Sequence, residues 1–293
     1  MTSHTLTRRP VIDRLAATRA DVVDHDDFVD HALGDDVGPG GPALLYLTGF
    51  GANRSVWRAT ARMTAGWRRS VTMDWRRHGT NPPGPHDYTL ADLADDALGV
   101  LDALGIDRFV PVASAHSGWV ALELARRFPR RVPAVILVGW MPLGAPEPFL
   151  AGLDAMRDPE RWQGAVAGLT GGWVRGHEHV PGLVDTVEGM RAQGFDMWSR
   201  AAELISEAFH RHRGPLAAFG RLENPVPVLH QYAAPTDSGF LSAQLATALH
   251  TPWFEVHRLD HARSHFPMLE APEEIAARAE SFLRARLTTP AGR

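Results

Sequence analysis

Residues 109–128 read FVPVASAHSGWVALELARRF. The first four residues, Phe109 to Val112, are an apolar run of strand type, and residues 113–118 are small and turn-like. From Trp119 to Phe128 the apolar residues recur at helical spacing. A strand, a tight turn of small residues and a helix form the context in which a G-x-S-x-G motif presents a nucleophile above a sheet. We therefore predict a turn that holds one side chain beside a helix N-terminus.

The predicted turn has no serine at the nucleophile position. The small residues align with Ala113 in the first position and Ala115 in the place of the nucleophile, followed by His116. Alanine cannot form an acyl-enzyme, but the backbone N–H of His116 can still help to hold an oxyanion. An alternative register makes Ser117 the nucleophile and places Trp119 where a small residue must let the helix pack against the strand.

Composition limits the classes of protein to which the chain can belong. Its 293 residues allow one large α/β domain with an inserted subdomain. The net charge of −4 gives no basic surface for nucleic acid, and the absence of cysteine excludes disulfides and thiolate chemistry. No apolar run is long enough for a membrane span, and the N-terminus lacks an apolar signal core. We expect a cytoplasmic protein with no nucleic-acid or membrane partner; the sequence leaves its oligomeric state open.

The rest of the chain alternates between strand and helix patterns. Apolar strand runs occur at 43–47, 70–73, 132–138, 225–231 and 254–259, with helical patterns at 57–67, 90–104 and 273–287. This alternation predicts a mainly parallel sheet with helices on both faces and a site beyond the carboxyl ends of the strands. Residues 146–221 are helical and rich in Trp and Gly. We expect them to form a helical cap inserted into an α/β core of residues 1–145 and 222–293.

Three positions outside the turn are candidates for chemistry. His265 follows the last strand and precedes the last helix, where a general base stands in the chain order nucleophile, acid, histidine, and an imidazole can take a proton from a hydroxyl. Asp237, after the penultimate strand, is the candidate carboxylate to orient it, with Asp260 as a local alternative. The backbone N–H of Phe50, after the first buried strand, is a candidate second oxyanion donor.

A metal site is not expected. The histidine pairs His177/His179 and His210/His212 are spaced two apart, so neither pair shares a helix face. No cysteine or carboxylate cluster completes a ligand set around them.

Several segments together resemble one known family. They are PVASAHSGW at the turn, DWRRHG at 74–79, DPERW at 158–162, GFDMW at 194–198 and HFP at 265–267. They are similar to the cofactor-independent 3-hydroxy-4-oxoquinoline and 3-hydroxy-4-oxoquinaldine 2,4-dioxygenases, which have an α/β-hydrolase fold. The similarity runs from about Leu44 to the C-terminus. It implies an enzyme that uses no metal or flavin, takes O2 as co-substrate and binds a small aromatic heterocycle.

The resemblance also implies roles for individual residues. In that family a histidine removes the substrate hydroxyl proton, the electron-rich anion reacts with O2, the ring opens and carbon monoxide leaves. The resemblance assigns the base to His265, the oxyanion donors to Phe50 and His116, and a pocket aromatic to Trp173. The residues that we expect to contact the substrate are Ser114, Ala115, Ser117, Trp119, Trp140 and Trp173.

The chain departs from the family pattern at three positions. Ala115 replaces the elbow serine, Ser114 replaces the histidine before it, and Gly139 replaces the aspartate that orients the base. The serine does not acylate in that family, so its loss weakens substrate positioning more than it forbids the chemistry. The loss of the aspartate is more serious unless Asp237 takes its place. These changes suggest a substrate or reaction that has diverged from the family's.

We expect first a cofactor-free oxygenase that acts on a hydroxylated N-heteroaromatic compound such as a 3-hydroxy-4-quinolone. The second hypothesis is a hydrolase or lyase that uses Ser117, Ser114 or a histidine-activated water. The third is a small-molecule binding protein without catalytic activity.

Overall fold

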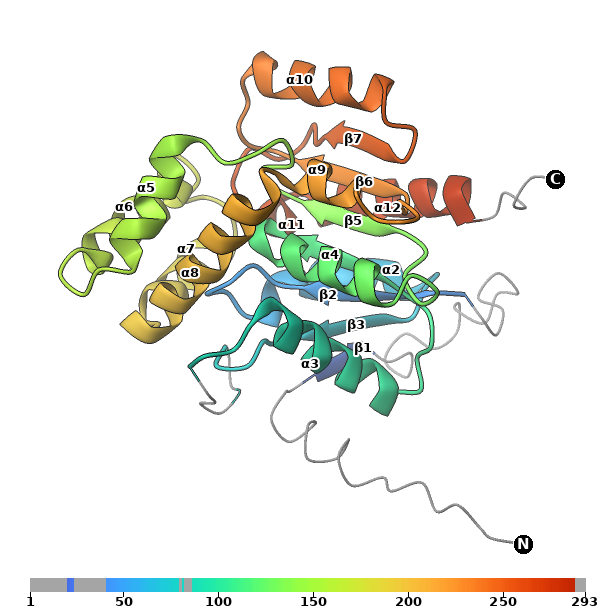
Figure 1. Ribbon diagram of the computed structural model, residues 1–293, viewed down its shortest axis with the longest axis horizontal. Helices are drawn as coiled ribbons and strands as arrows, with labels where there is room; N and C mark the ends of the chain where they lie inside the picture. The colour runs from blue at the N-terminus through green and yellow to red at the C-terminus, as the bar shows by residue number, and fades with distance from the viewer. Residues whose placement is uncertain (1–19, 24–40, 79–80, 82–85, 288–293) are drawn as a thin grey trace, which may run out of the picture.

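The computed structural model describes residues 20–23, 41–78, 81 and 86–287 (Figure 1). Within these residues one seven-stranded sheet has the order β1-β3-β2-β4-β5-β6-β7. β1 pairs with β3 antiparallel, and every other neighbouring pair is parallel. The strands are β1 (Ala20–Val23), β2 (Ala43–Leu47), β3 (Ser70–Met73), β4 (Phe109–Ser114), β5 (Val135–Val138), β6 (Val228–Tyr232) and β7 (Phe254–Arg258). The predicted mainly parallel sheet is confirmed.

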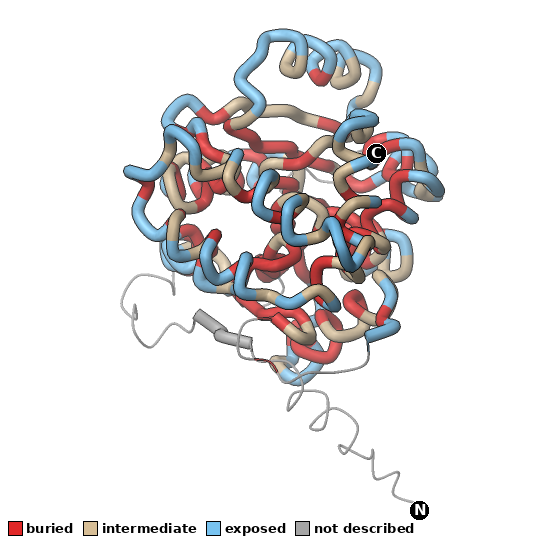
Figure 2. Tube along the Cα trace, turned by 90° about the vertical axis from the view of Figure 1, so that its left-hand side faces the viewer, coloured by how far each residue is buried: buried red, intermediate tan, exposed pale blue. Residues whose placement is uncertain are grey.

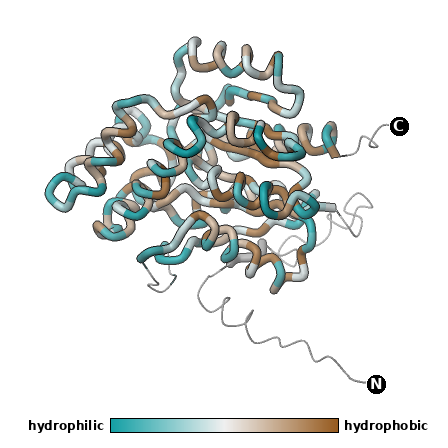
Figure 3. Tube along the Cα trace, viewed as in Figure 1, coloured by the Kyte–Doolittle hydropathy of each residue, from teal (hydrophilic) through white to brown (hydrophobic). Residues whose placement is uncertain are grey.

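The central strands are predominantly apolar because both faces of the sheet are covered. Every residue of β2 to β6 is buried. Figure 2 shows the buried residues gathered in the central layer of the molecule, and Figure 3 shows the hydrophobic segments in the same layer. This layer is the core that fixes the strand ends.

Helices cover both faces of the sheet (Figure 1). On one face α2 (Arg58–Ala65), which follows the 3-10 turn η2 (Arg54–Trp57), packs against α12 (Pro272–Leu287). On the other face α3 (Leu90–Ala103) packs against α4 (Gly118–Arg127). α10 (Ser238–Leu249) contacts β7, and the short α11 (Pro267–Glu270) precedes α12. No helix within the described ranges combines the length and the apolar character that a membrane crossing needs.

The chain between β5 and β6 is helical, as the sequence indicates for residues 146–221. It forms α5 (Glu147–Met156), α6 (Trp162–Val174), α7 (Leu183–Arg191), α8 (Phe195–His212) and α9 (Pro215–Phe219). α5 packs on α6 and α8, and α6 also packs on α7. In Figure 1 α5 to α8 stand together beside the carboxyl ends of the strands, whereas α9 lies against α4.

The register of the sheet places two sequence-distant turns side by side. Ser114, the last residue of β4, pairs with Val138, the last residue of β5. The residues that follow, Ala115 and Gly139, therefore leave the sheet at the same level. In a parallel sheet this is the edge at which ligands bind.

A capping box starts α3. The Thr89 hydroxyl accepts a hydrogen bond from the N–H of Asp92, and the Asp92 carboxylate accepts one from the N–H of Thr89 at 2.7 Å. We expect Thr89→Ala to lower the free energy of unfolding by about 1 kcal/mol, because it exposes an unpaired helix N–H. Urea denaturation measures the change. Thr89→Ser keeps the hydroxyl and should stay within about 0.5 kcal/mol of the wild-type protein; an equal loss in both variants would contradict the role of the cap.

Candidate active site

The turn after β4 has the strained geometry that the sequence predicts. Ala115 has a φ of +47°, in the left-handed region that residues other than glycine seldom adopt. The 3-10 turn η3 (Ala115–Ser117) follows and leads directly into α4. The turn thus presents position 115 at the strand end, with a methyl group in place of a nucleophile.

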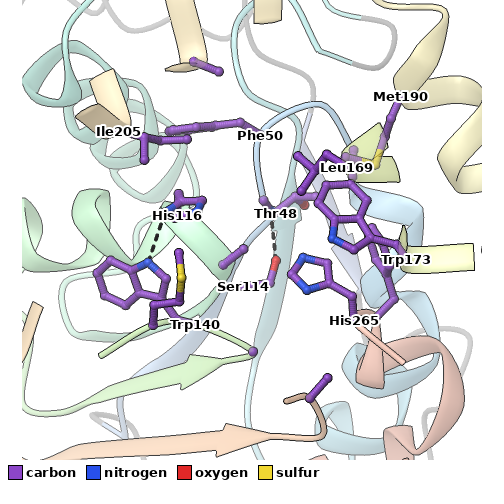
Figure 4. Close-up of a pocket in the computed structure, with 18 of the residues that line it drawn as sticks. Thr48, Phe50, Ser114, His116, Trp140, Leu169, Trp173, Met190, Ile205 and His265 are labelled. Carbon is purple, nitrogen blue, oxygen red and sulfur yellow. Dashed lines mark hydrogen bonds between the residues drawn. The ribbon is translucent and has the colours of Figure 1, made fainter. Parts of the chain in front are cut away.

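A cavity of about 380 Å³ lies beyond this turn. The turn, the loops after β2, β5 and β6, the loop before α11 and the helices α5 to α8 all contribute to its wall. Figure 4 shows His265 and Trp173 on one side of the cavity and His116 and Trp140 on the other, with Ser114 between them. The sequence-predicted residues that the structure brings together here are Phe50, Ser114, Ala115, His116, Trp140, Trp173 and His265.

His265 lies flat against an indole ring. Its imidazole stacks on Trp173 with the ring centroids 4.5 Å apart and the planes 5° apart. Phe266 meets the same imidazole edge-on at 5.3 Å. Burial lowers the pKa of His265 to about 4, because the charged form loses its hydration. The ring is therefore neutral at pH 7 and can accept a proton.

Carboxylates hold the backbone of the loop that carries His265. Glu270 accepts hydrogen bonds from the N–H groups of Arg263 and Ser264, both at 2.8 Å. Glu274 holds two further N–H groups at the start of the loop. Burial works against the ionisation of both glutamates, but these N–H donors outweigh it and lower their pKa values. The position of the imidazole thus follows from a fixed backbone.

The structure does not bring Asp237 to His265, which corrects the prediction of an orienting acid. Asp237 is exposed, and its carboxylate accepts the N–H of Phe240 at 2.8 Å to cap α10. Asp260 is also exposed and does not line the cavity. Gly139 has a φ of +62°, and a side chain there would start 3.6 Å from the carbonyl oxygen of His265. Among the residues that the structure describes, no carboxylate hydrogen-bonds to the imidazole of His265.

The hydroxyl of Ser117 is used inside the protein. It lies 2.9 Å from the carbonyl oxygen of Leu47 and 2.8 Å from that of Ser114, and Ser117 is fully buried. Ser117 does not line the cavity, so the register that makes it the nucleophile, and its expected contact with substrate, are corrected. The hydroxyl of Ser114, which does line the cavity, accepts the N–H of Gly49 at 2.8 Å. The two serines fasten the turn to the end of β2.

Trp119 also lies outside the cavity, contrary to its predicted contact with substrate. It is only 1% exposed, because the first turn of α4 directs it into the core. Its ring packs edge-on against Trp140 at 5.0 Å and stacks on His212 at 5.6 Å. Trp119 is therefore a packing residue of the core and not a substrate contact.

The two predicted oxyanion donors stand on neighbouring turns of the cavity wall, joined by the hydrogen bond from Gly49 to Ser114. Phe50 is in the turn after β2, where its N–H has no backbone acceptor within the described residues. His116 is in the first turn of η3, where an N–H has no partner within the helix. The N–H of Gly49 is occupied by Ser114. Phe50 and His116 therefore remain the predicted pair.

A second imidazole of the cavity is also neutral. Burial, together with the nearby imidazole of His265, lowers the pKa of His116 to about 3. Its ring stacks on Phe149 at 5.1 Å, and its Nδ1 accepts a hydrogen bond of 3.2 Å from the indole N–H of Trp140. Sequence reasoning gave His116 only a backbone role.

Sequence reasoning missed the apolar wall that α5 to α8 supply. Its side chains are Phe149, Leu153, Met156, Leu169, Met190, Trp198 and Ile205. The available signal was the apolar face of each helix, but this pattern does not distinguish residues that line a cavity from residues that pack in a core.

No group of three or more His, Asp or Glu side chains within the described ranges is placed to hold a metal ion.

This fold and site define the class of the protein. A family model described as the alpha/beta hydrolase fold matches residues 42–173. The strand-end turn, the late histidine loop and the helical insertion after β5 are arranged around one cavity in that fold. The protein therefore has an α/β-hydrolase fold, as predicted.

Close relatives narrow the class to a family. The chain is 36% identical to a 2-heptyl-3-hydroxy-4-quinolone dioxygenase of Rhodococcus erythropolis and 34% identical to one of Mycobacteroides abscessus, in each case over 83% of the chain and 90% of the relative. The solved structure of AqdC with its product, described as a basis for recognition and ring cleavage of the Pseudomonas quinolone signal, superposes with a TM-score of 0.80 at 31% identity, over 91% of this chain and 96% of that one. The protein belongs to the 3-hydroxy-4-quinolone dioxygenase family, which confirms the resemblance.

The position of Trp140 depends on the absence of a side chain at Gly118. A Cβ atom at Gly118 would lie 2.3 Å from a ring carbon of Trp140, which is itself only 2% exposed. We expect Gly118→Ala to lower the free energy of unfolding by about 1–3 kcal/mol, because the added methyl group would overlap the buried indole of Trp140.

Gly168→Ala is the matched control for this variant. A Cβ atom at Gly168, within α6, would meet nothing within 4 Å. Alanine there should leave stability unchanged or raise it by up to about 1 kcal/mol. Chemical denaturation of both variants tests the contrast; two changes of the same sign would contradict the packing argument.

Proposed function

We propose that the protein is a cofactor-independent dioxygenase that opens the ring of 2-alkyl-3-hydroxy-4-quinolones. The observation that carries the proposal is a neutral His265, stacked on Trp173 in the cavity wall, beside a strand-end turn that has no nucleophile. Family membership supplies the reaction class.

His265 is the base in this proposal. A neutral imidazole can take the proton of the 3-hydroxyl group, and the stack on Trp173 limits rotation of the ring. The resulting electron-rich anion reacts directly with O2, the ring opens and carbon monoxide leaves. This chemistry needs no acyl-enzyme, so Ala115 does not prevent it.

The charge of the substrate anion needs hydrogen-bond donors in the cavity. The backbone N–H groups of Phe50 and His116 are our candidates, because both residues line the cavity on loops held by the sheet. Preorganised donors of this kind are worth more in a water-excluded site than in water.

The helices α5 to α8 act as a cap that recognises an alkyl chain. Leu153, Met156, Leu169, Met190 and Ile205 give the cavity a wall of flexible apolar side chains. Such a wall favours an unbranched hydrocarbon, and each methylene that it buries contributes about 0.8 kcal/mol. The relatives that carry 2-heptyl-3-hydroxy-4-quinolone in their names support this choice of substrate.

The hydrolase alternative lacks a nucleophile at the right place. Ser117 is sealed behind the turn, and the Ser114 hydroxyl is engaged by Gly49. No observation favours acyl transfer over the dioxygenase reaction.

Oxygen uptake and carbon monoxide release with 2-alkyl-3-hydroxy-4-quinolones of increasing chain length test the proposal. We expect one mole of carbon monoxide to be released for each mole of O2 consumed. We also expect kcat/KM to rise with the length of the alkyl chain until the cavity is filled. His265→Ala should lower kcat by at least about 100-fold, because it removes the base. His250→Ala, which alters an exposed histidine at the end of α10, should retain the wild-type rate. Full turnover by His265→Ala would refute the assignment of the base.

The pH profile tests the state of the base. Since burial lowers the pKa of His265 to about 4, the accepting form is present above that pH and is lost as the pH falls through it. We expect kcat/KM to hold its neutral-pH value down to about pH 5 and to decline near pH 4. A solvent-exposed histidine would already fail near pH 6.5. Steady-state rates between pH 4 and 8, with circular dichroism to check folding at each pH, distinguish the two; a midpoint near 6.5 would contradict the burial argument.

A further inference from the structure

The geometry points to Trp140 as a positioning residue: we propose that its indole N–H fixes His116 as the Nε2–H tautomer, so that the cavity holds one imidazole that donates a hydrogen bond and one that accepts a proton. The inference rests on the proposed function for its effect on turnover, but the tautomer itself can be tested without any substrate.

The tautomer follows from the partners of His116. An indole N–H can only donate a hydrogen bond, so the Nδ1 of His116, 3.2 Å from the Nε1 of Trp140, must accept it. A neutral imidazole that accepts at Nδ1 carries its proton on Nε2. This nitrogen has no hydrogen-bond partner among the described residues, and His116 lines the cavity on the side opposite His265 (Figure 4). The Nε2–H group is therefore a donor available to a ligand.

The indole of Trp140 is held by packing on two sides. Its ring lies directly over Gly118, where a Cβ atom would come within 2.3 Å of it. Trp119 packs edge-on against it at 5.0 Å, with an 89° angle between the planes. Neither contact leaves the ring room to turn its N–H away from His116.

A buried hydrogen-bond chain holds the backbone of the same residue. The backbone N–H of Trp140 donates to Nε2 of His230 at 3.1 Å, so the proton of this neutral histidine must be on Nδ1, which donates to the Gln244 side chain at 2.6 Å. Both His230 and Gln244 are fully buried. The chain thus runs from α10 through β6 to the loop after β5, and the indole of Trp140 extends it to His116.

The chemical consequence is a division of roles between two histidines. His265 has no side chain among the described residues that commits one of its nitrogens, and it acts as the base. His116 is committed as a donor, and its Nε2–H can bond the negatively charged oxygen that forms when His265 removes the substrate proton. A donor that is oriented before the charge develops stabilises the transition state more than the ground state. Its loss should therefore lower kcat more than it raises KM.

Nitrogen-15 NMR of the histidine-labelled protein tests the tautomer directly. The His116 signals are assigned by their absence in His116→Asn. In the substrate-free wild-type protein at pH 7 we expect a protonated Nε2 and an unprotonated, hydrogen-bonded Nδ1. Trp140→Phe removes the indole N–H, and the His116 signals should then show a mixture of tautomers or ring orientations. A protonated Nδ1 in the wild-type protein, or unchanged signals in Trp140→Phe, would overturn the inference.

Kinetics test whether the tautomer matters for turnover. Trp140→Phe should lower kcat about tenfold or more while KM stays within about twofold. Trp57→Phe is the matched control, because Trp57 is fully buried outside the cavity and its indole N–H has no hydrogen-bond partner within the described residues. It should leave kcat unchanged. An unchanged kcat in Trp140→Phe, or an equal loss in Trp57→Phe, would reject the positioning role.

The NMR and kinetic experiments separate this inference from the proposed function. If the wild-type protein consumes no O2 with any 3-hydroxy-4-quinolone, the proposed function fails, while the NMR result still decides the tautomer. If turnover is present but the NMR arm fails, only the role of Trp140 is lost.

Discussion

The burial of two imidazoles in the wall of one cavity is the constraint on which this site depends. His116 and His265 face one cavity, and burial keeps both neutral at pH values where a histidine in water would begin to take up a proton. Burial alone accounts for the neutral form of His265, so no carboxylate partner is needed to set its protonation state. The apolar side chains of α5 to α8 that line the cavity therefore contribute to the protonation state on which the proposed chemistry relies.

The parallel sheet supplies the positional precision that the cavity needs. β4 and β5 end in register, so the turn at Ala115 and the loop at Gly139 and Trp140 begin side by side. The loop that carries His265 is fastened by glutamates from the two helices that follow it, through backbone N–H groups. The turn at Ala115, the loop at Trp140 and the loop of His265 thus each begin at the end of a strand of the sheet, which positions their side chains around one cavity.

Much of this arrangement could be predicted from the sequence because it follows from local patterns. The apolar runs gave the strands, the small residues at 113–118 gave the turn, and chain order gave His265. The predictions that failed concern side chains that a helix cap or the core uses instead of the cavity. The place of Asp237 in the chain suits an orienting acid, but Asp237 is also the residue before a helix, and its carboxylate accepts the N–H of Phe240 in the first turn of α10. Ser117 and Trp119 fit a pocket by proximity to the turn, but the pitch of η3 and α4 directs both into the core. The partnership of Trp140 with His116 joins elements that only the sheet brings together, so no local pattern indicates it.

The methyl group at Ala115 has a practical consequence for work in mixtures of enzymes. Covalent inhibitors of serine esterases and lipases capture the hydroxyl that stands at this corner of the fold. Here position 115 carries no oxygen, the adjacent Ser117 is sealed in the interior, and the Ser114 hydroxyl is held by the N–H of Gly49. Such inhibitors can therefore silence the background esterases of a cell extract and leave this protein intact, which gives a simple way to follow its reaction before it is purified.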